Sequence, residues 1–567
     1  MARSLTPEDL YAFALVEDPQ ISPDGETIAF VKQEMDRGKY EYRRSIWLQP
    51  TQGGPARRFT SGGADTHPRW SPDGQYLAFE RGPVGEVKPK TKAERDAGKG
   101  RPQLYVMPVA GGEAQQLTHL RYGAGEPVWS PDSKTIAFAA RTGLPDDAEV
   151  DDLALEDVRV PKVRTLTEFV YKRDSVGYTY ELRSHLFTVC VECALTGQPG
   201  GEPRQVTDGD WNDASPEWSP DGRRIAFLSD RSDQRWRWPA NAVWTVALAS
   251  GETKRLTNEA LNVGSVGWSP NGRMLAFLSG VRRHGVGHTD LYVVDANAST
   301  PGAERRLSDD FTPTCADTCI DDMRGSHGAA HLTWSPDSEE IFFLGSMRGT
   351  THVYAARAHS NRLPRRVTDG NLRIYGYSFD RARDTLALAI STPTVPGDLY
   401  TQEYRASDAS ATPLTPRRLT NLNAQLLAEV ALATPEEFDF RGADDWELQG
   451  WVLRPANARR GEKLPTILQI HGGPASMYGY AFFMEFQLLA AKGYAVVYSN
   501  PRGSTGYGRI FSGAVIADWG NKDYQDILAG LDAAIARGGI DERRLGIAGG
   551  SYGGYMTNWI VGHNDRF

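Results

Sequence analysis

Short apolar segments recur through the first three quarters of the chain, and each follows a polar turn. The segments are TIAFV, YLAFE, TIAFA, RIAFL, MLAFL, IFFLG and TLALA. A second strand-like segment follows, such as LYVMPV at 104–109. Each repeat then ends with a short motif such as RRFT, QQLT or KRLT. A period of about 40–50 residues with several strands per unit is typical of the blades of a β-propeller.

The turn that precedes each segment is itself repeated. It occurs as ISPDG, WSPDG, WSPDS, WSPDG, WSPNG, WSPDS and a degenerate YSFD, with serines at 22, 71, 130, 219, 269, 335 and 378. Pro fixes φ and Gly supplies a positive φ, so Pro-Asp-Gly forms a tight turn. Seven copies predict a seven-bladed β-propeller over residues 17–425. We expect the Trp of each turn to pack between blades, and the Trp and Asp residues to be structural.

The steps between these serines range from 43 residues (335 to 378) to 89 residues (130 to 219), so the longer units carry insertions. Residues 82–101 are Lys-rich and polar, which favours a solvated loop. Residues 141–182 combine an acidic run with an aromatic stretch. Insertions in such arrays often form the binding face. Tyr171, Arg173, Tyr178 and Tyr180 are therefore candidates to contact substrate, although packing within the insertion is the favoured interpretation.

The hydrophobic pattern changes after about residue 420. EEFDF and WELQGWVLRP predict a hairpin, and apolar strands follow at 466–470, 494–499 and 544–549. Helices are expected at 482–493 and 523–539, between these strands. Alternation of strands and helices predicts a parallel sheet covered by helices. Residues 431–567 are thus expected to form a doubly wound α/β domain.

A G-x-S-x-G motif lies at the end of the third of these strands. Gly549-Gly550-Ser551-Tyr552-Gly553 stands between strand 544–549 and a helix, the context in which this motif forms a nucleophile elbow. HGGP at 471–474 closes the first parallel strand, where a glycine loop lets backbone N–H groups approach an oxyanion. We predict that Ser551 is the nucleophile and that the N–H groups of Gly473 and Tyr552 form the oxyanion hole.

A serine nucleophile needs a histidine base and an acid that orients the histidine, and in hydrolases of this kind both follow the serine along the chain. His563 lies twelve residues past Ser551, about 18 Å along a helix, which is too far to reach its hydroxyl. His471 lies on the oxyanion side, and neither Asp541 nor Asp565 has a histidine to orient. The sequence therefore predicts a hydrolase domain truncated after the elbow, with its catalytic Asp and His beyond residue 567.

Composition narrows the classes of function. The chain has 567 residues, a formal net charge of −9 and a pI of about 5.8, which gives no basic stripe for nucleic acid. No signal peptide and no apolar stretch of 18 residues is visible, so we expect no membrane partner and a cytoplasmic location. No cofactor is expected.

The four cysteines form two close pairs, Cys190 with Cys193 and Cys315 with Cys319. Free cysteines that pack as small hydrophobic residues are the favoured interpretation. A four-cysteine zinc site and a local disulfide remain as alternatives.

Three motifs together resemble the prolyl oligopeptidase family of serine peptidases: HGGP at 471–474, NPRGSTGYG at 500–508 and GGSYGGY at 549–555. The HGGP loop is most similar to the acylaminoacyl-peptidase branch. The resemblance implies hydrolysis of short, including N-acylated, peptides through an acyl-enzyme on Ser551, in a chamber between propeller and hydrolase. It also implies that an N-terminal unit over residues 1–16, with a helix expected over residues 6–16 (TPEDLYAFALV), packs on the hydrolase domain, and that Arg502 holds loops together.

Two alternatives stand beside this interpretation. The chain could be a non-catalytic truncated homologue whose propeller binds peptides or protein partners. The elbow alone would also suit a lipase or small-ester hydrolase, although a propeller favours peptides. A homo-oligomer and a separate C-terminal fragment as partner are left open.

Overall fold

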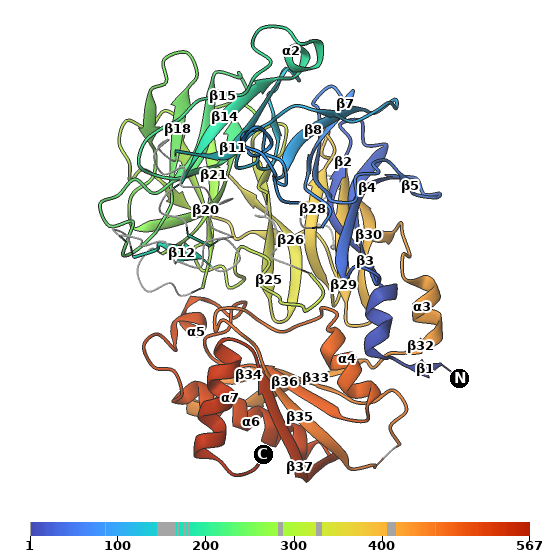
Figure 1. Ribbon diagram of the computed structural model, residues 1–567. Helices are drawn as coiled ribbons and strands as arrows, with labels where there is room; N and C mark the ends of the chain where they lie inside the picture. Colours follow the sequence, from blue (N-terminus) through green and yellow to red (C-terminus); the bar gives the residue numbers. More distant parts are fainter. Residues whose placement is uncertain are drawn as a thin grey trace.

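The computed structural model describes residues 2–85, 87–143, 166, 169–173, 177–178, 182–281, 287–324, 331–404, 415–459 and 461–567. These residues form two bodies (Figure 1). The upper body consists of small antiparallel sheets, and the lower body is one sheet with helices beside it.

Four-stranded antiparallel sheets make up the upper body. Within the described ranges, five of these sheets share no strand pairing with one another. The first sheet contains β2 (Ala14–Ile21), β3 (Thr27–Asp36), β4 (Glu41–Pro50) and β5 (Arg57–Arg58), and the second contains β6 (Asp65–Trp70), β7 (Tyr76–Arg81), β8 (Gln103–Pro108) and β9 (Gln115–Gln116). The third contains β10 (Val128–Trp129), β11 (Thr135–Thr142), β14 (Arg183–Cys190) and β15 (Arg204–Gln205), and the fourth contains β16 (Asp213–Trp218), β17 (Arg224–Ser229), β18 (Ala242–Ala247) and β19 (Thr253–Arg255). The fifth contains β20 (Leu261–Trp268), β21 (Met274–Val281), β22 (Asp290–Asp295) and β23 (Arg305–Arg306).

The remaining strands of this body join in one eight-stranded sheet. They are β24 (Thr333–Trp334), β25 (Glu340–Met347), β26 (Thr350–Arg357), β27 (Arg365–Arg366), β28 (Arg373–Phe379), β29 (Thr385–Thr392), β30 (Val395–Glu403) and β31 (Arg417–Arg418). The parallel pair Thr351–Arg373 connects β26 with β28, and every other pairing between these described strands is antiparallel.

The repeated Trp connects neighbouring sheets, as expected. The indole N–H of Trp70 donates to the carbonyl of Gln20 at 2.8 Å, and that of Trp129 donates to the carbonyl of Arg69 at 3.0 Å. The same contact with the preceding sheet recurs at Trp218, Trp268 and Trp334. These tryptophans therefore have a structural role.

The first and last sheets of the upper body pack against each other. The Ile21 N–H donates to Ser378 Oγ at 2.8 Å, and the Tyr375 hydroxyl donates to the Val16 carbonyl at 2.8 Å. A buried cluster joins the two sheets through Val16, Ile21, Ile28, Phe30, Ala387, Ala389 and Leu399. The series of sheets thus closes on itself, which is the arrangement of a propeller.

The insertions carry little regular structure in their described parts. Residues 82–101 contain α1 (Lys92–Asp96), and the second insertion contains the paired strands β12 (Lys172–Arg173) and β13 (Gly177–Tyr178). Tyr171 is exposed, whereas Tyr180 and the side chains of Arg173 and Tyr178 lie outside the described part of the chain. Contact of these residues with substrate stays a prediction.

The N-terminal helix is shorter than the expected 6–16 range. It is the 3-10 helix η1 (Pro7–Ala12), and β2 already begins at Ala14. The expectation was wrong for residues 13–16 because the Ala14 N–H donates to Asn423 Oδ1 at 2.8 Å and the following residues pair with β3. Tertiary hydrogen bonds outweigh helix propensity there.

The same segment contacts the lower body. β1 (Arg3–Ser4) pairs with β32 (Val430–Ala431), which follows α3 (Ala424–Glu429). Phe13 packs on Phe482 with ring centroids 5.5 Å apart. Leu5 and Met484 belong to the same buried cluster, so the N-terminal segment lies between the two bodies.

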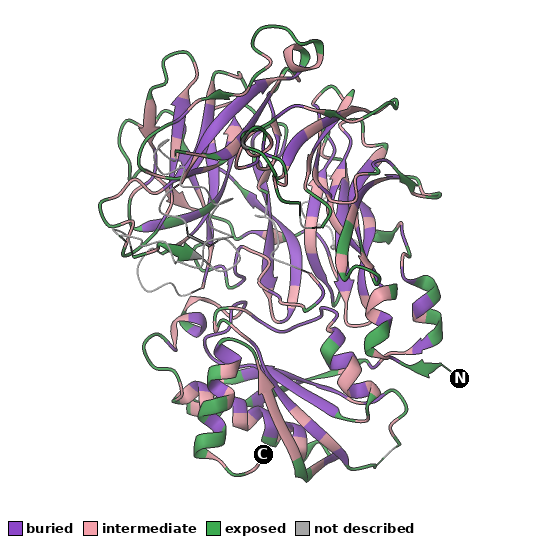
Figure 2. Ribbon diagram, in the orientation of Figure 1, coloured by how far each residue is buried: buried purple, intermediate pink, exposed green. Residues whose placement is uncertain are grey.

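The lower body is a five-stranded sheet in the order β33 (Pro435–Arg441), β34 (Glu447–Leu453), β36 (Ala495–Asn500), β35 (Leu464–Ile470) and β37 (Ile540–Gly549). The first two strands form the expected hairpin, with η4 (Ala443–Asp445) at its turn, and β36, β35 and β37 run parallel. Figure 2 shows β36 fully buried and much of β37 at intermediate exposure.

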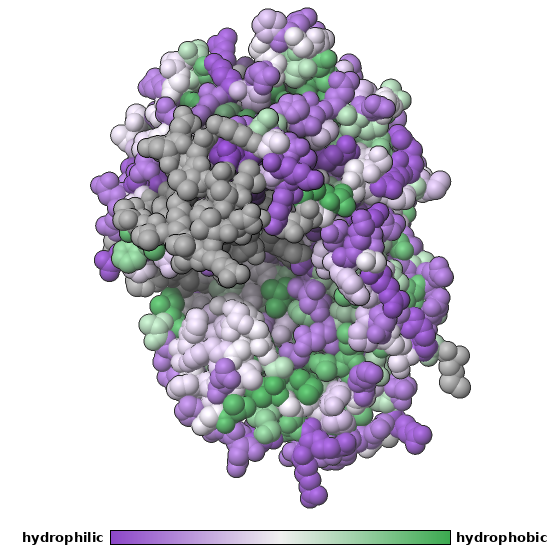
Figure 3. Space-filling model, viewed as in Figure 1, coloured by the Kyte–Doolittle hydropathy of each residue, from purple (hydrophilic) through white to green (hydrophobic). Residues whose placement is uncertain are grey.

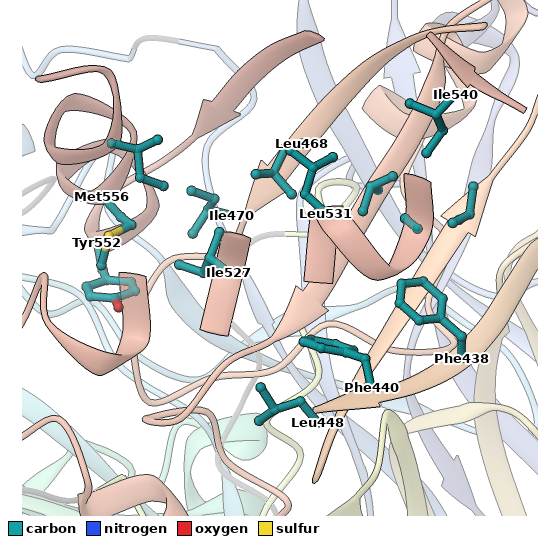
Figure 4. Close-up of a cluster of buried hydrophobic side chains, with 14 of the residues drawn as sticks. Phe438, Phe440, Leu448, Leu468, Ile470, Ile527, Leu531, Ile540, Tyr552 and Met556 are labelled. Atoms are coloured by element: carbon teal, nitrogen blue, oxygen red, sulfur yellow. The ribbon is translucent and has the colours of Figure 1, made fainter. Parts of the chain in front are cut away.

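Helices cover both faces of this sheet, as the alternation predicts. α4 (Met484–Ala491) packs on one face, where Phe486 and Ala490 join Val496 and Tyr498. α6 (Lys522–Ala536) and α7 (Tyr552–His563) pack on the other face; Figure 4 shows part of this cluster, whose labelled members are Phe438, Phe440, Leu448, Leu468, Ile470, Ile527, Leu531, Ile540, Tyr552 and Met556. The short α5 (Arg509–Gly513) follows β36.

The two bodies contact through the later sheets of the upper one. The Gly349 carbonyl accepts the Tyr480 N–H at 2.8 Å, and Ser391 Oγ accepts the Phe482 N–H at 3.1 Å. Arg509 forms an ion pair with Asp290. On the face shown in Figure 3, hydrophilic side chains predominate among the coloured residues of the upper body, and hydrophobic side chains form a band across the lower body above a hydrophilic bottom edge.

The cysteines differ between the two pairs. Cys190 and Cys193 form a disulfide, so their interpretation as free packed thiols was wrong. Cys315 and Cys319 are free and buried, so the interpretation as packed free thiols is confirmed for this pair. In the part of the chain that the structure describes, no group of three or more His, Cys, Asp or Glu could hold a metal ion. None of the described helices has the length and apolar character that a membrane span requires.

Candidate active site

Ser551 lies at the turn from β37 into α7. Its backbone has φ 56° and ψ −121°, and the residue is exposed. A positive φ is uncommon for a residue with a side chain, and such conformations occur at active sites. The Gly553 N–H donates to the Gly550 carbonyl at 2.8 Å, and the Tyr555 N–H donates to the Ser551 carbonyl at 3.0 Å. These two bonds fix the turn that presents the serine.

The glycines of the elbow are required by close backbone contacts. A Cβ on Gly553 would lie 2.0 Å from the Ile470 carbonyl oxygen. A Cβ on Gly549 would lie 2.6 Å from the carbonyl carbon of Gly553. Glycine at both positions therefore lets α7 begin directly against the ends of β35 and β37.

The buried side chain of Tyr552 holds the start of α7 in place. Its ring is buried, and its hydroxyl donates to Asp523 Oδ2 at 2.6 Å. Asp523, itself buried near the start of α6, also accepts the Gly520 N–H at 2.9 Å. Burial and the neighbouring carboxylate raise the pKa of Tyr552 well above its usual value, so the phenol stays neutral and donates.

The HGGP loop lies beside the elbow. A Cβ on Gly472 would lie 3.4 Å from Ser551 Cβ, so the loop runs directly beside the serine. Gly473 has φ 120°, a conformation that favours glycine. Tyr552 is the first residue of α7, and the first N–H groups of a helix have no intrahelical acceptor. The structure thus brings the loop and the start of α7 to the serine; oxyanion binding by Gly473 and Tyr552 stays a prediction.

His471 holds the loop in place. It is buried, with Nδ1 2.7 Å from the Gly472 carbonyl oxygen and Nε2 2.9 Å from Ser504 Oγ. Burial lowers its pKa to about 4, so the imidazole is neutral at pH 7. Because both ring nitrogens have partners within the loops, His471 is a positioning residue. Its partner Ser504 lies in NPRGSTGYG, a motif whose role in this contact the sequence did not reveal.

Arg502 joins loops around the same site. Its Nε donates to Asp526 at 2.7 Å, and another nitrogen donates to the Ala443 carbonyl at 2.6 Å. It also pairs with Asp444 at 3.0 Å and stacks 4.5 Å from the Trp446 ring. Arg502 and Asp526 are buried and Asp444 is exposed, and the network agrees with a loop-holding role.

His563, considered as the base, and Asp541, considered as the acid that orients a base, have partners other than Ser551. His563 Nδ1 is 2.8 Å from the Trp559 carbonyl oxygen, and its ring stacks on Trp559 with centroids 4.2 Å apart. Asp541 pairs with Arg544 at 2.7 Å. Among the residues that the structure describes, no histidine hydrogen-bonds to Ser551 Oγ.

A strand, a strained serine turn and a helix beside a glycine loop define the nucleophile elbow of an α/β-hydrolase. The family model described as "Prolyl oligopeptidase family" matches residues 480–567. A peptidase of Bacillus subtilis (strain 168), named "Uncharacterized peptidase YuxL", is 36% identical across 100% of this chain and 81% of its own length. This chain therefore belongs to the prolyl oligopeptidase family of serine peptidases.

More distant relatives agree with this assignment. Dipeptidyl-peptidase 5 of Porphyromonas gingivalis is 23% identical over 99% of this chain and 77% of its own. The structure of an acylaminoacyl peptidase of Pyrococcus horikoshii has a TM-score of 0.76 at 23% identity, covering 100% of this chain and 78% of that one. The fold is accordingly a propeller joined to an α/β-hydrolase domain.

Proposed function

We propose that this protein hydrolyses short peptides, including N-acylated ones, through an acyl-enzyme on Ser551. The observation that carries the proposal is the exposed serine at positive φ beside the Gly472–Gly473 loop. Ser551 Oγ attacks the peptide carbonyl, and the N–H groups of Gly473 and Tyr552 stabilise the resulting oxyanion. The amine leaves, and water then releases the acyl group.

The base and its orienting carboxylate are proposed to come from polypeptide outside residues 1–567. This is supported by the hydrogen bonds of His471 and His563, whose ring nitrogens contact other residues than Ser551. The relatives named above are also longer than this chain. Ser551 without a base is a weak nucleophile, so residues 1–567 alone are expected not to turn over peptides.

The upper body is proposed to act as a seven-bladed propeller that admits only short substrates. The seven copies of the turn support this number, and the eight-stranded sheet divides at its parallel pair into two four-stranded sets. The alternative of a non-catalytic homologue is not favoured, because the relatives named above are peptidases and Ser551 is exposed beside the glycine loop.

The proposal is tested with the protein as the cell makes it. Chromogenic substrates with one N-acetylated residue and with a free dipeptide are compared, and Ser551→Ala serves as the catalytic control. We expect hydrolysis of at least one substrate by the wild type and none by Ser551→Ala. Equal hydrolysis by both proteins, or no hydrolysis of either substrate by folded wild type, would overturn the proposal.

A further inference from the structure

A disulfide stands at the end of the propeller farthest from the lower body. Cys190 ends β14, and Cys193 lies in α2 (Val191–Thr196), which Figure 1 places at the top of the molecule. The two cysteines are three residues apart in sequence, and both are partly exposed. The bond is therefore remote from Ser551 and joins two partly exposed residues.

A cleft adjoins this disulfide. It has a volume of about 630 Å³ and lies between the third and fourth sheets. Cys190 lines the cleft, and Trp218 contributes an aromatic side chain to its wall. Four charged residues line it as well: Asp132, Asp221, Glu202 and Arg204.

The cleft carries charges of both signs, with acidic groups in excess. Asp132 and Asp221 accept hydrogen bonds from Ser130 and Ser219, which lower the pKa of both carboxyl groups. Both are anionic at neutral pH, while Arg204 is cationic. A ligand that carries an ammonium group and a carboxylate would complement both signs.

We propose that Cys190–Cys193 is a thiol–disulfide exchange site, and that the cleft binds a small peptide thiol that carries an ammonium group and a carboxylate. A thiolate of the ligand attacks Cys190 Sγ, forms a mixed disulfide and breaks the Cys190–Cys193 bond. Cys193 leaves as a thiolate and takes up a proton. A second ligand thiolate attacks the ligand sulfur of the mixed disulfide, releases the ligand as its disulfide and leaves Cys190 reduced. Two thiols thus supply the two electrons.

The contacts around the bond fit this sequence of steps. The Cys193 N–H donates to Cys190 Sγ at 3.3 Å, and such a donor stabilises a thiolate on Cys190 when it leaves in the second step. β14 pairs with β11 from Thr135–Cys190 to Thr142–Arg183. A disulfide that closes so short a loop stabilises the fold less than one that closes a long loop, and the strand pairing does not depend on the bond, so the sheet should persist after reduction.

The other two cysteines provide an internal control. Cys315 and Cys319 are 0% and 2% exposed. Burial raises the pKa of Cys319 to about 12 and that of Cys315 further, so neither should react with an alkylating reagent in the folded protein.

The first experiment uses reduced glutathione as the probe and needs no peptidase activity. The folded protein is incubated with iodoacetamide, with and without prior glutathione, and labelled sites are found by peptide mass spectrometry. We expect no label without glutathione and label on Cys190 and Cys193 after it, while Cys315 and Cys319 stay unlabelled. Label without any reductant, or no label after excess glutathione although a denaturant with dithiothreitol releases both thiols, would overturn the proposal.

A second experiment tests the cleft. Cys193→Ser leaves Cys190 to react with oxidised glutathione, and Cys190→Ser leaves Cys193 as the matched control. We expect Cys190 to react about tenfold faster than Cys193, and Arg204→Ala to slow this reaction but not that with the uncharged hydroxyethyl disulfide. Equal rates for the two cysteines, or no effect of Arg204→Ala on the glutathione reaction, would contradict ligand binding in the cleft.

Discussion

Two kinds of tight turn in this molecule carry a serine, and their hydroxyl groups differ. In the propeller turn, buried Ser71 donates to Asp73 Oδ1 at 2.5 Å and accepts the Tyr76 N–H at 2.9 Å. In the elbow, Ser551 is exposed at positive φ beside a glycine loop. A serine whose hydroxyl is engaged by its own turn is structural, whereas one presented to solvent by a strained turn is available to react.

Glycine also has different tasks in the two turns. Gly74 of the propeller turn has φ 74°, and a Cβ there would be 3.9 Å from the nearest atom, so its conformation is what requires glycine. Gly553 of the elbow lies in a helix, and the space beside it is what requires glycine. Glycine is thus required by its backbone angles in the propeller turn and by close packing in the elbow.

The largest expected effect is that of Gly553→Ala. Its Cβ would overlap the Ile470 carbonyl, so we expect a loss of about 3 kcal/mol or more in the free energy of unfolding. The matched control is Gly550→Ala, because no atom lies within 4 Å of a Cβ there. Urea unfolding of both variants measures the difference, and equal costs would contradict the close-packing account.

A pH effect of about 2 kcal/mol is expected from His471. Its folded-state pKa of about 4 lies below the ordinary value of 6.5, so the unfolded chain binds the proton more readily and stability falls as the pH drops from about 6.5 towards 4. Between pH 8 and pH 5 the wild type should lose about 2 kcal/mol more than His471→Asn. Identical pH dependence of the two proteins would show that His471 is not buried in its neutral form.

Tyr552→Phe should cost about 1–2 kcal/mol in the free energy of unfolding, since Asp523 loses a donor while buried. The backbone N–H at this position is kept, so the reaction of Ser551 with a fluorophosphonate should continue at a similar rate. Loss of that reaction in a stably folded variant would assign the side chain, and not the N–H group, to the chemistry.

The smallest expected effect is the difference in free energy of unfolding between Ser71→Ala and Ser551→Ala. Ser71→Ala removes a partner of Asp73 and of the Tyr76 N–H, and should cost about 1 kcal/mol. Ser551→Ala should change the free energy of unfolding by less than about 0.5 kcal/mol. Thermal unfolding of both variants checks this, and a larger cost at Ser551 would mean that its hydroxyl has a structural role.

Local patterns predicted the parts of this molecule that local contacts determine. The repeated turn predicted the propeller, and strand, G-x-S-x-G and helix predicted the elbow, because each depends on neighbouring residues. The 6–16 helix was predicted too long, since Asn423, 409 positions away, binds the Ala14 N–H. The contacts of His471 with Ser504 and of Tyr552 with Asp523 depend on the folded sheet, and no spacing in the sequence indicates them.

Whether Ser551 is the nucleophile is tested most directly by its own covalent modification. The protein as the cell makes it is treated with a fluorophosphonate, and the modified peptide is identified by mass spectrometry, with Ser551→Ala and Ser71→Ala as controls. The account predicts modification at Ser551 in the wild type and in Ser71→Ala, and none in Ser551→Ala. Modification at another serine, or none in the folded wild-type protein, would contradict it.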